Sequence, residues 1–507
     1  MLYFTVRMAG IGGLKWTPRS SMTSNILFKR KLYQQLLDWK NQDHGRSAVL
    51  IEGARRVGKS TLALNFAQQE YESYLLLDFS KTTKEIKALF YNYPDDLNTL
   101  FSFLQKMTGV DLPKRNSLII FDEIQFFPQA RQMIKHFVAD GRYDFMETGS
   151  LISIRENVTD ILSPSEETSL TLHPLDFEEF CTALNRGGII DYIQQCFAKR
   201  EPLDESMHKT AMTLFKKYLL VGGMPQSVAA FLAGENAFTA ADKAKRGILS
   251  VYQKDIRKIN SRYKDKVFNI FKMLPELLGR SEKRVVLNQI ANYNDPQPYY
   301  DPFFWLEDSM IVNECFLCTD PQIGFDFYKK STAVKCYMGD TGLLATYAMA
   351  RNTVALDELY NGILNGRLGI NQGMLYENMI AQMLAANGHP LFYYAHYDPI
   401  KKRSDIEVDF LLTMPDGLKL KISPIEVKSS KNYTTKSLDR FREKFKKRVG
   451  ECFIIHPRNL QQKNGVWCIP PYMTICLWGG RIAWRTQKRS LLLFLTLRVK
   501  QFLTLCI

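Results

Sequence analysis

Residues 53–60 read GARRVGKS, and their types and spacing suit the binding of phosphate groups. The two glycines let the backbone curl so that successive N–H groups face a phosphate. A helix that starts at the end of this loop adds the partial positive charge of its N-terminus. Lys59 would reach the β- and γ-phosphates, and the Ser60 hydroxyl would hold Mg²⁺. The sequence therefore predicts a site for ATP and Mg²⁺.

Residues 117–125, SLIIFDEIQ, place two carboxylates at the end of an apolar strand. We expect Asp122 to enter the Mg²⁺ shell and Glu123 to polarise the attacking water as a general base. Thr148 and Ser150 end a further strand and could contact the γ-phosphate; the alternative is a turn after a buried strand. The residues predicted to bind the nucleotide are Gly53, Ala54, Arg55, Arg56, Val57, Gly58, Lys59, Ser60, Thr61 and Ser150.

A second chemical set lies in the C-terminal half, where EVDFLLT at 407–413 precedes PIEVK at 424–428. Asp409 and Glu426 are carboxylates that suit Mg²⁺, and Lys428 would position or activate a metal-bound water for attack on a phosphodiester. Glu377, from a helix upstream, could complete the metal shell. The Glu-x-Lys pattern alone is a weak signal, so an active nuclease and a retained, inactive or protein-binding fold both stay open. Glu407 is expected on the same side as Asp409.

Strands and helices that could position these residues alternate along the chain. We expect strands at 48–52, 74–78, 117–125, 144–150 and near 169–172, with a helix after the phosphate loop, which together predict a parallel, doubly wound sheet. In the C-terminal half the pattern predicts a helix at 373–386, strands at 391–394, 407–413 and 424–428, and a basic helix at 435–448.

Nine segments together resemble one family. They are GARRVGKS, FDEIQ, TGSLI, PLDFEEF, YLLVGGMPQSV, YMGDTGLL, YEN, EVDF and IEVKSS. From about Leu27 to Leu477 the chain resembles the prokaryotic AAA-type ATP-binding proteins, of the AAA+ superfamily, that carry a C-terminal domain of unknown function. The resemblance implies an AAA-type core whose sensor strand lies between the P-loop and Walker-B strands, and a helical lid. Many relatives carry a Gly-Arg pair before PL-FEEF, which this chain lacks, so Arg55, Arg56 and Arg257 are finger or sensor candidates without support.

The region between the two chemical sets divides into helices and a winged-helix pattern. Residues 176–260 are expected to be helical, with Pro225 able to open a helix after Gly222 and Gly223. Residues 267–345 resemble a winged helix-turn-helix, with a first helix that places Phe268, Phe271, Leu274 and Leu277 on one face, two further helices at 285–291 and 298–310, and strands at 311–318 and near 333–338. The third helix is aromatic and acidic, which favours packing or protein contact over DNA readout.

The C-terminal arrangement resembles the restriction-endonuclease-like PD-(D/E)xK fold. The expected fold class is thus multidomain α/β. The expected parts are an extension at 1–21, a P-loop ATPase core at 22–180, a helical lid at 181–260, a winged-helix domain at 261–350, a linker at 351–372, a PD-(D/E)xK-like domain at 373–478 and a basic tail at 479–507 that need not belong to the fold.

The net charge of +15 is concentrated at the two ends of the 507-residue chain. Residues 1–21 and 481–507 carry nine basic and no acidic side chains, which leaves +6 for residues 22–480. Nine irregularly spaced cysteines favour reduced thiols in a cytoplasm. No apolar run approaches the ~18 residues of a membrane span, so no membrane partner is expected.

Taken together, these observations predict a cytoplasmic ATPase whose nucleotide state acts on winged-helix and nuclease-like domains. The first alternative is a nucleotide-gated nuclease or other DNA-processing protein that cuts with Asp409, Glu426 and Lys428. The second is a non-enzymatic ATP-bound switch that recruits a protein partner. The basic helix at 435–448 could contact DNA phosphates or form a solvated face, and the sequence does not predict an oligomeric state.

Overall fold

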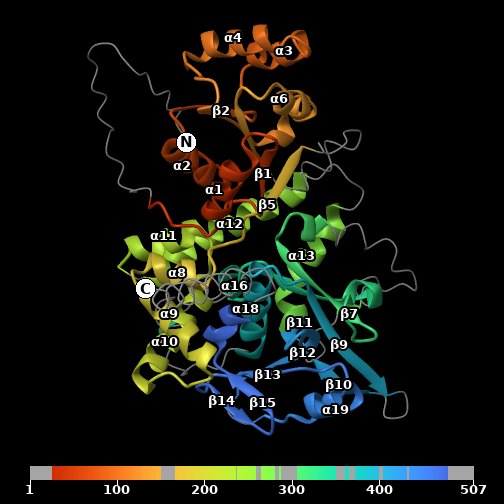
Figure 1. Cartoon of the computed structure of the whole chain (residues 1–507). Helices are drawn as coiled ribbons and strands as arrows, with labels where there is room; N and C mark the ends of the chain where they lie inside the picture. Colours follow the sequence, from red (N-terminus) through yellow and green to blue (C-terminus); the bar gives the residue numbers. More distant parts are fainter. Residues whose placement is uncertain are drawn as a thin grey trace, which may run out of the picture. The chain divides into compact units, whose positions relative to one another are not determined.

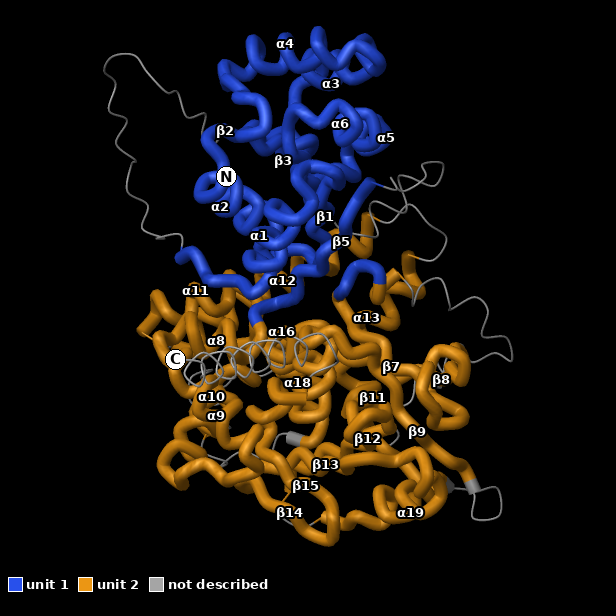
Figure 2. Tube along the Cα trace, viewed as in Figure 1, with its two compact units in different colours: residues 1–175, 308–310 blue, residues 176–307, 311–507 orange. Residues whose placement is uncertain are grey.

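A computed structural model of the chain describes residues 26–149, 166–235, 237–258, 264–279, 285–286, 305–349, 360–362, 364, 372–398, 403–430 and 433–477 (Figure 1). The expected N-terminal extension, the basic tail, Ser150 and most of the expected linker lie outside these residues. The chain forms two compact units, one of residues 1–175 with 308–310 and the other of residues 176–307 with 311–507 (Figure 2).

The first unit is built on a parallel sheet of five strands. These are β1 (Ala48–Glu52), β2 (Ser73–Asp78), β3 (Ser117–Asp122), β4 (Asp144–Gly149) and β5 (Glu167–Thr171), in the order β2-β3-β4-β1-β5. Strands β3 and β4 are buried throughout, as expected for parallel strands covered on both faces. The predicted parallel sheet is confirmed, and β4 lies between the P-loop strand β1 and the Walker-B strand β3, as the resemblance implied.

Helices surround this sheet and close an aromatic core. They are α1 (Leu32–Asp43), α2 (Lys59–Glu70), α3 (Lys84–Asn92), α4 (Leu97–Thr108), the short 3-10 turn Ile124–Phe126, α5 (Pro128–Gln132) and α6 (Ile134–Asp140). Phe121 of β3 lies with its ring centre 5.4 Å from that of Phe79 and 6.0 Å from those of Phe90 and Phe145. This packing fixes β3, and with it the acidic pair at its end.

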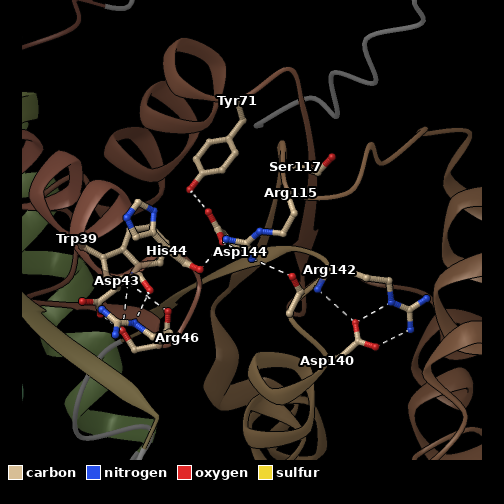
Figure 3. A network of polar contacts seen from close by, with 12 residues as sticks. Trp39, Asp43, His44, Arg46, Tyr71, Arg115, Ser117, Asp140, Arg142 and Asp144 are labelled. Carbon is tan, nitrogen blue, oxygen red and sulfur yellow. Dashed lines mark hydrogen bonds and ion pairs between the residues drawn. The ribbon is translucent and has the colours of Figure 1, made fainter.

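A polar network ties down the amino ends of β3 and β4 (Figure 3). The buried Asp144 accepts a hydrogen bond of 2.7 Å from the Tyr71 hydroxyl and lies 3.7 Å from Arg115. Arg115 also donates to the carbonyl oxygens of His44 and Gly141. Burial, together with the Asp144 charge, raises the pKa of Tyr71 well above its usual value. Because the strands are parallel, all their amino ends lie on one side of the sheet. The network therefore anchors the side opposite the carboxyl ends, where ligands bind in such sheets.

The second unit begins with the helices that the sequence predicted for residues 176–260. They are α8 (Phe177–Ala183), α9 (Gly188–Lys199), α10 (Glu205–Val221), α11 (Pro225–Ala233) and α12 (Phe238–Lys258), and Pro225 does open a helix. The glycines between α10 and α11 pack against α16 (Thr341–Ala348): Asp340 accepts a 2.6 Å bond from the Gly223 N–H, and a Cβ at Gly342 would lie 2.5 Å from the Gly222 nitrogen. The GGMP and GDTG segments therefore form one contact.

Two five-stranded sheets complete the second unit. The first contains β6 (Val285–Val286), β7 (Val312–Cys318), β8 (Lys329–Met338), β9 (Leu391–Asp398) and β10 (Arg403–Val408), in the order β10-β9-β7-β8-β6. The second contains β11 (Phe410–Asp416), β12 (Lys419–Val427), β13 (Cys452–Ile455), β14 (Gln461–Lys463) and β15 (Val466–Ile469), in the order β11-β12-β13-β15-β14. Parallel pairing of β7 with β9 joins residues 315–317 to 391–393 in one sheet.

The expected winged-helix pattern agrees with the structure in part. Helix α13 (Lys264–Gly279) and the antiparallel strands β7 and β8 lie where it predicts them. The predicted helix over 285–291 is wrong at its start, because Val285 and Val286 pair with β8 as strand β6. The pair is β-branched, which favours a strand. Most of the predicted third helix, 298–310, lies outside the described residues.

Helices α18 (Gln372–Ala386) and α19 (Lys436–Lys444) accompany the C-terminal strands. Strand β11 runs antiparallel to β12, and β12 runs parallel to β13. The strand predicted at 407–413 is divided at Asp409, which lies between β10 and β11. Asp409 is thus at the point where the chain passes from one sheet of the unit to the other.

Candidate functional site

The phosphate-binding loop has the backbone that its glycines predict. Gly58 precedes α2 with a φ of 98°, and Gly53 has a φ of 155°. A Cβ at Gly53 would lie 2.3 Å from the Leu172 carbonyl oxygen, so a larger residue cannot replace it without moving the backbone. Helix α2 begins at Lys59, which directs its N-terminal N–H groups toward the loop.

Lys59 turns back onto the loop that precedes it. Its ammonium donates to the carbonyl oxygens of Gly53 at 2.8 Å and Ala54 at 3.1 Å. Burial lowers the pKa of Lys59 to about 8, and the charges of Glu123 and Asp122 oppose that shift. The partners of this ammonium are neutral carbonyl groups, so a phosphate would give it a stronger, charged partner.

Ser60, Asp122 and Thr148 come together at the carboxyl ends of the strands. The Ser60 hydroxyl donates to Asp122 Oδ1 at 2.7 Å, and the Thr148 hydroxyl donates to the same oxygen. A hydroxyl and a carboxylate side by side fit Mg²⁺, which prefers oxygen ligands and keeps several of its waters. Thr148, near the carboxyl end of β4, thus contacts the Walker-B aspartate directly.

Glu123 has an unusual backbone conformation next to this pair. Its φ of 53° and ψ of 49° place it in the left-handed region, which bulky residues rarely adopt. Its side chain accepts a 2.5 Å hydrogen bond from the Gln125 amide, and its N–H lies 3.5 Å from the Thr148 hydroxyl. Sequence reasoning gave Gln125 no role; its position two residues after Glu123 was the available signal.

The other predicted loop residues divide by exposure. Ala54 and Val57 are buried, whereas Arg55, Arg56 and Thr61 are exposed. No described contact assigns a finger or sensor role to Arg55 or Arg56. The third candidate, Arg257, stacks at 4.9 Å on the ring of Phe268, its neighbour in the second unit.

One arginine in the first unit is buried. Arg131 forms ion pairs of 2.7 Å with Glu147 of β4 and 2.9 Å with Glu167 of β5. Both carboxylates belong to strands that flank β1, so this triad braces the sheet from within. We assign it a structural role.

The four C-terminal residues that the sequence selected lie in one region. Lys428 is 2.9 Å from Glu426 at the end of β12, and Asp409 accepts a 2.8 Å bond from the N–H of Val427 between them. Burial raises the pKa of Glu426 to about 7, against the opposing charge of Lys428. Glu377 is buried on α18 and accepts a 2.6 Å bond from the Tyr337 hydroxyl.

A fifth residue, Lys335 of β8, was missed by the sequence reasoning. Its ammonium lies 3.6 Å from Glu377, 3.3 Å from Glu407 and 3.6 Å from Asp409. We call these three acids and Lys335 the lysine–carboxylate cluster. Lys335 stands in an alternating polar strand sequence far upstream of the acids, so the sequence offered no signal that placed it among them.

Cations of the basic helix make contacts within the fold. Arg440 donates to the Asp405 carbonyl, Arg442 to the Asn464 carbonyl and Lys444 to the Tyr394 hydroxyl, while Arg448, just beyond α19, pairs with Asp320 at 2.5 Å. These bonds favour a structural part for this face. Lys436, Lys446 and Lys447 complete its basic residues.

The described residues contain neither a cluster of metal ligands nor a membrane-spanning helix. Cys315 and Cys318 are free thiols buried in β7, and no three His, Cys, Asp or Glu side chains within the described part converge closely enough to hold a metal ion. Helices long and apolar enough to cross a membrane are also missing from that part of the chain.

Comparisons with known proteins identify three segments of the chain. Residues 45–181 match the model of an AAA domain, residues 212–354 a domain of unknown function (DUF8612), and residues 372–473 another domain of unknown function (DUF4143). No curated protein matches the chain.

Several solved structures resemble the chain at low identity. A Walker-type ATPase of Pyrococcus abyssi is 15% identical, with a TM-score of 0.38 over 63% of this chain and 96% of its own. The Aeropyrum pernix Orc1 protein in complex with DNA is 11% identical, with a TM-score of 0.26 over 65% and 94%. A signal transduction ATPase with numerous domains from Pyrococcus horikoshii is 13% identical, with a TM-score of 0.25 over 73% and 50%.

The sheet order, the loop geometry and the family match all concern the same residues. The matched segment contains β1, the phosphate loop, β3 with its acidic pair, and β4. Residues 45–181 of this chain are an AAA-type P-loop ATPase domain.

Proposed function

We propose that the protein binds ATP with Mg²⁺ and hydrolyses it. One observation carries the proposal: Lys59, Ser60, Asp122 and Glu123 lie together where a phosphate-binding loop, a helix N-terminus and the end of a buried strand meet. Each has the chemistry that one step of phosphoryl transfer to water needs. This arrangement in an AAA-type domain is best explained as a site that binds and hydrolyses the nucleotide.

The proposed roles follow from the contacts. The loop N–H groups and Lys59 bind the β- and γ-phosphates, and Lys59 exchanges its bonds to Gly53 and Ala54 for bonds to phosphate. Ser60 and Asp122 would hold Mg²⁺, which neutralises phosphate charge when bound. Glu123 polarises the attacking water, and Gln125 positions its carboxylate.

We further propose that the nucleotide state acts on the second unit and that the protein works in the cytoplasm. The division into core, lid, winged-helix and nuclease-like domains belongs to this proposal. It is supported by the helices at 177–258, by the hairpin of β7 and β8, and by the order of α18, β9 to β12, α19 and β13. The eight described cysteines are all free, which suits a reducing compartment.

Steady-state ATP turnover tests the proposal. The full chain is expected to release phosphate in the presence of Mg²⁺, and Glu123→Gln should bind ATP with nearly unchanged affinity while losing at least ~100-fold in kcat. The matched control is Glu178→Gln, an acid at the start of α8 that no role above uses. Turnover that survives Glu123→Gln unchanged would remove Glu123 from the mechanism, and an absence of turnover in the wild type would leave the ATP-bound switch as the function.

Phosphodiester cleavage is the second candidate function. In its favour, Asp409, Glu426 and Lys428 meet at the end of β12, next to Glu377. Cleavage by these residues would use Mg²⁺, and the cluster fits that ion poorly because Lys335 already lies between its carboxylates. We therefore do not assign DNA cleavage to the protein in this conformation.

A further inference from the structure

The lysine–carboxylate cluster contains its own cation. Three acids surround the Lys335 ammonium at 3.3–3.6 Å. They are Glu377 of α18, Glu407 of β10 and Asp409, which directly follows β10. Lys335 comes from β8 and reaches them past the ring of Tyr393, whose centre lies 5.0 Å from the ammonium. Its side chain is 1% exposed, so water does not supply its partners.

Electrostatics keep this lysine charged. Burial by itself favours loss of the proton from an ammonium, as Lys245 illustrates: it donates to the Leu220 carbonyl, and burial lowers its pKa to about 8 although the charges of Asp242 and Asp340 oppose that shift. At Lys335 the effect of burial is outweighed by Glu377, Asp409 and Glu407, which raise the pKa above its usual value. The three carboxylates within 3.6 Å thus favour the charged form of the ammonium.

Other bonds hold the acids in place around Lys335. Glu377 accepts from the Tyr337 hydroxyl at 2.6 Å, and Asp409 accepts from the Val427 N–H at 2.8 Å. A Mg²⁺ ion would require their oxygens at ~2.1 Å from one point. No three such side chains in the described residues converge in that way around the ammonium, so the acids would have to move closer together to hold an ion once Lys335 is gone.

We propose that Lys335 takes the place of a divalent cation in this cluster, so that the protein binds no metal ion there until the ammonium is removed. The cluster and the adjoining Glu426–Lys428 pair hold four carboxylates and two lysines. Loss of the Lys335 charge raises the excess of carboxylates over ammonium groups from two to three, and a divalent cation would offset that excess. The inference is independent of ATP hydrolysis, because no group of the nucleotide site takes part in it.

Removal of the ammonium should therefore create a metal site. The probe is Mn²⁺, whose uptake by the nucleotide-free full chain is followed by electron paramagnetic resonance. Every protein carries Asp122→Asn, so that the nucleotide site contributes no Mn²⁺. Lys335→Ala is expected to gain one Mn²⁺ per chain with an affinity at least ~10-fold above that of its parent, and Lys335→Ala/Asp409→Asn should lose it.

Two controls separate charge from space. Lys335→Arg keeps the positive charge and should bind no Mn²⁺, and Lys245→Ala removes a different buried lysine and should also bind none. Uptake by Lys245→Ala to the same extent would show that any buried cavity suffices and would overturn the proposal. A folded Lys335→Ala that takes up no Mn²⁺ would overturn it as well.

The wild-type cluster provides a test that does not depend on a stable variant. Mn²⁺ uptake should be the same with Asp409 intact and with Asp409→Asn, because Lys335 keeps the ion out. Should the parent protein bind one Mn²⁺ that Asp409→Asn abolishes, the proposal fails, even if Lys335→Ala does not fold. In a Lys335→Ala protein that does fold, Mn²⁺ should also raise the Tm, and Asp409→Asn should cancel that rise.

Discussion

Lys59 and Lys335 are two lysines near carboxylates, the first half-buried and the second fully buried, and their surroundings give them opposite properties. Lys59 donates to neutral carbonyl groups, and burial lowers its pKa to about 8. Lys335 is surrounded by three acids, which raise its pKa. The difference teaches that the same residue type can donate to neutral carbonyl groups at one site and form ion pairs at the other. A phosphate at Lys59 would replace neutral partners by a charged one, whereas a cation at the cluster would have to displace Lys335 itself.

Loss of the charge at each lysine should affect stability unequally. Lys335→Met leaves three acids without their cation and should lower the free energy of unfolding by about 3–5 kcal/mol. Lys59→Met removes an ammonium that burial already disfavours and should change it by less than about 1 kcal/mol. Urea unfolding followed at both units measures the two values. Equal effects would contradict the comparison.

ATP turnover should respond in the reverse order. Lys59→Ala should lower kcat/KM at least ~100-fold, because the phosphates lose their charged partner. Lys335→Ala, assayed where it remains folded, should stay within about threefold of the wild type. Phosphate release under saturating and limiting ATP separates kcat from KM. A large loss in the Lys335 variant would mean that the cluster and the nucleotide site are coupled.

The affinity for ATP should depend on pH through Lys59. In the free protein its pKa is about 8, so above that pH binding must first restore the proton. The affinity should therefore fall by up to ~10-fold per pH unit above 8 and be flat between pH 6 and 7.5. Lys59→Arg, which stays protonated, should show no such fall. Titration with a fluorescent ATP analogue measures the slope.

The smallest effect concerns Gln125, which holds the carboxylate of Glu123. Gln125→Ala should lower kcat by about two- to tenfold with an unchanged KM, since the base is still present but less well placed. Gln125→Asn keeps the amide and should recover part of the loss. A change in KM alone would place Gln125 in nucleotide binding.

The sequence predicted the nucleotide site better than the C-terminal cluster, for a physical reason. The P-loop, Ser60 and Asp122 belong to short segments whose local geometry follows from glycines and apolar strand residues, and the strand at 48–52 has the predicted bounds. The cluster depends on distant elements: Lys335 reaches acids of α18 and β10 only after β7, β8 and β9 have formed one sheet. No local pattern in KKSTAVKCYM distinguishes a buried lysine from a solvated one.

The parallel pairing of β7 with β9 has a consequence for biosynthesis. Residues 315–317 leave the ribosome well before residues 391–393. The N–H and C=O groups on one side of β7 therefore stay unpaired until β9 has been synthesised. Long-range pairing of this kind is slow. During this period the open edge of β7 in the nascent chain can pair with other chains. In a fragment that ends before residue 391, this edge stays unpaired permanently.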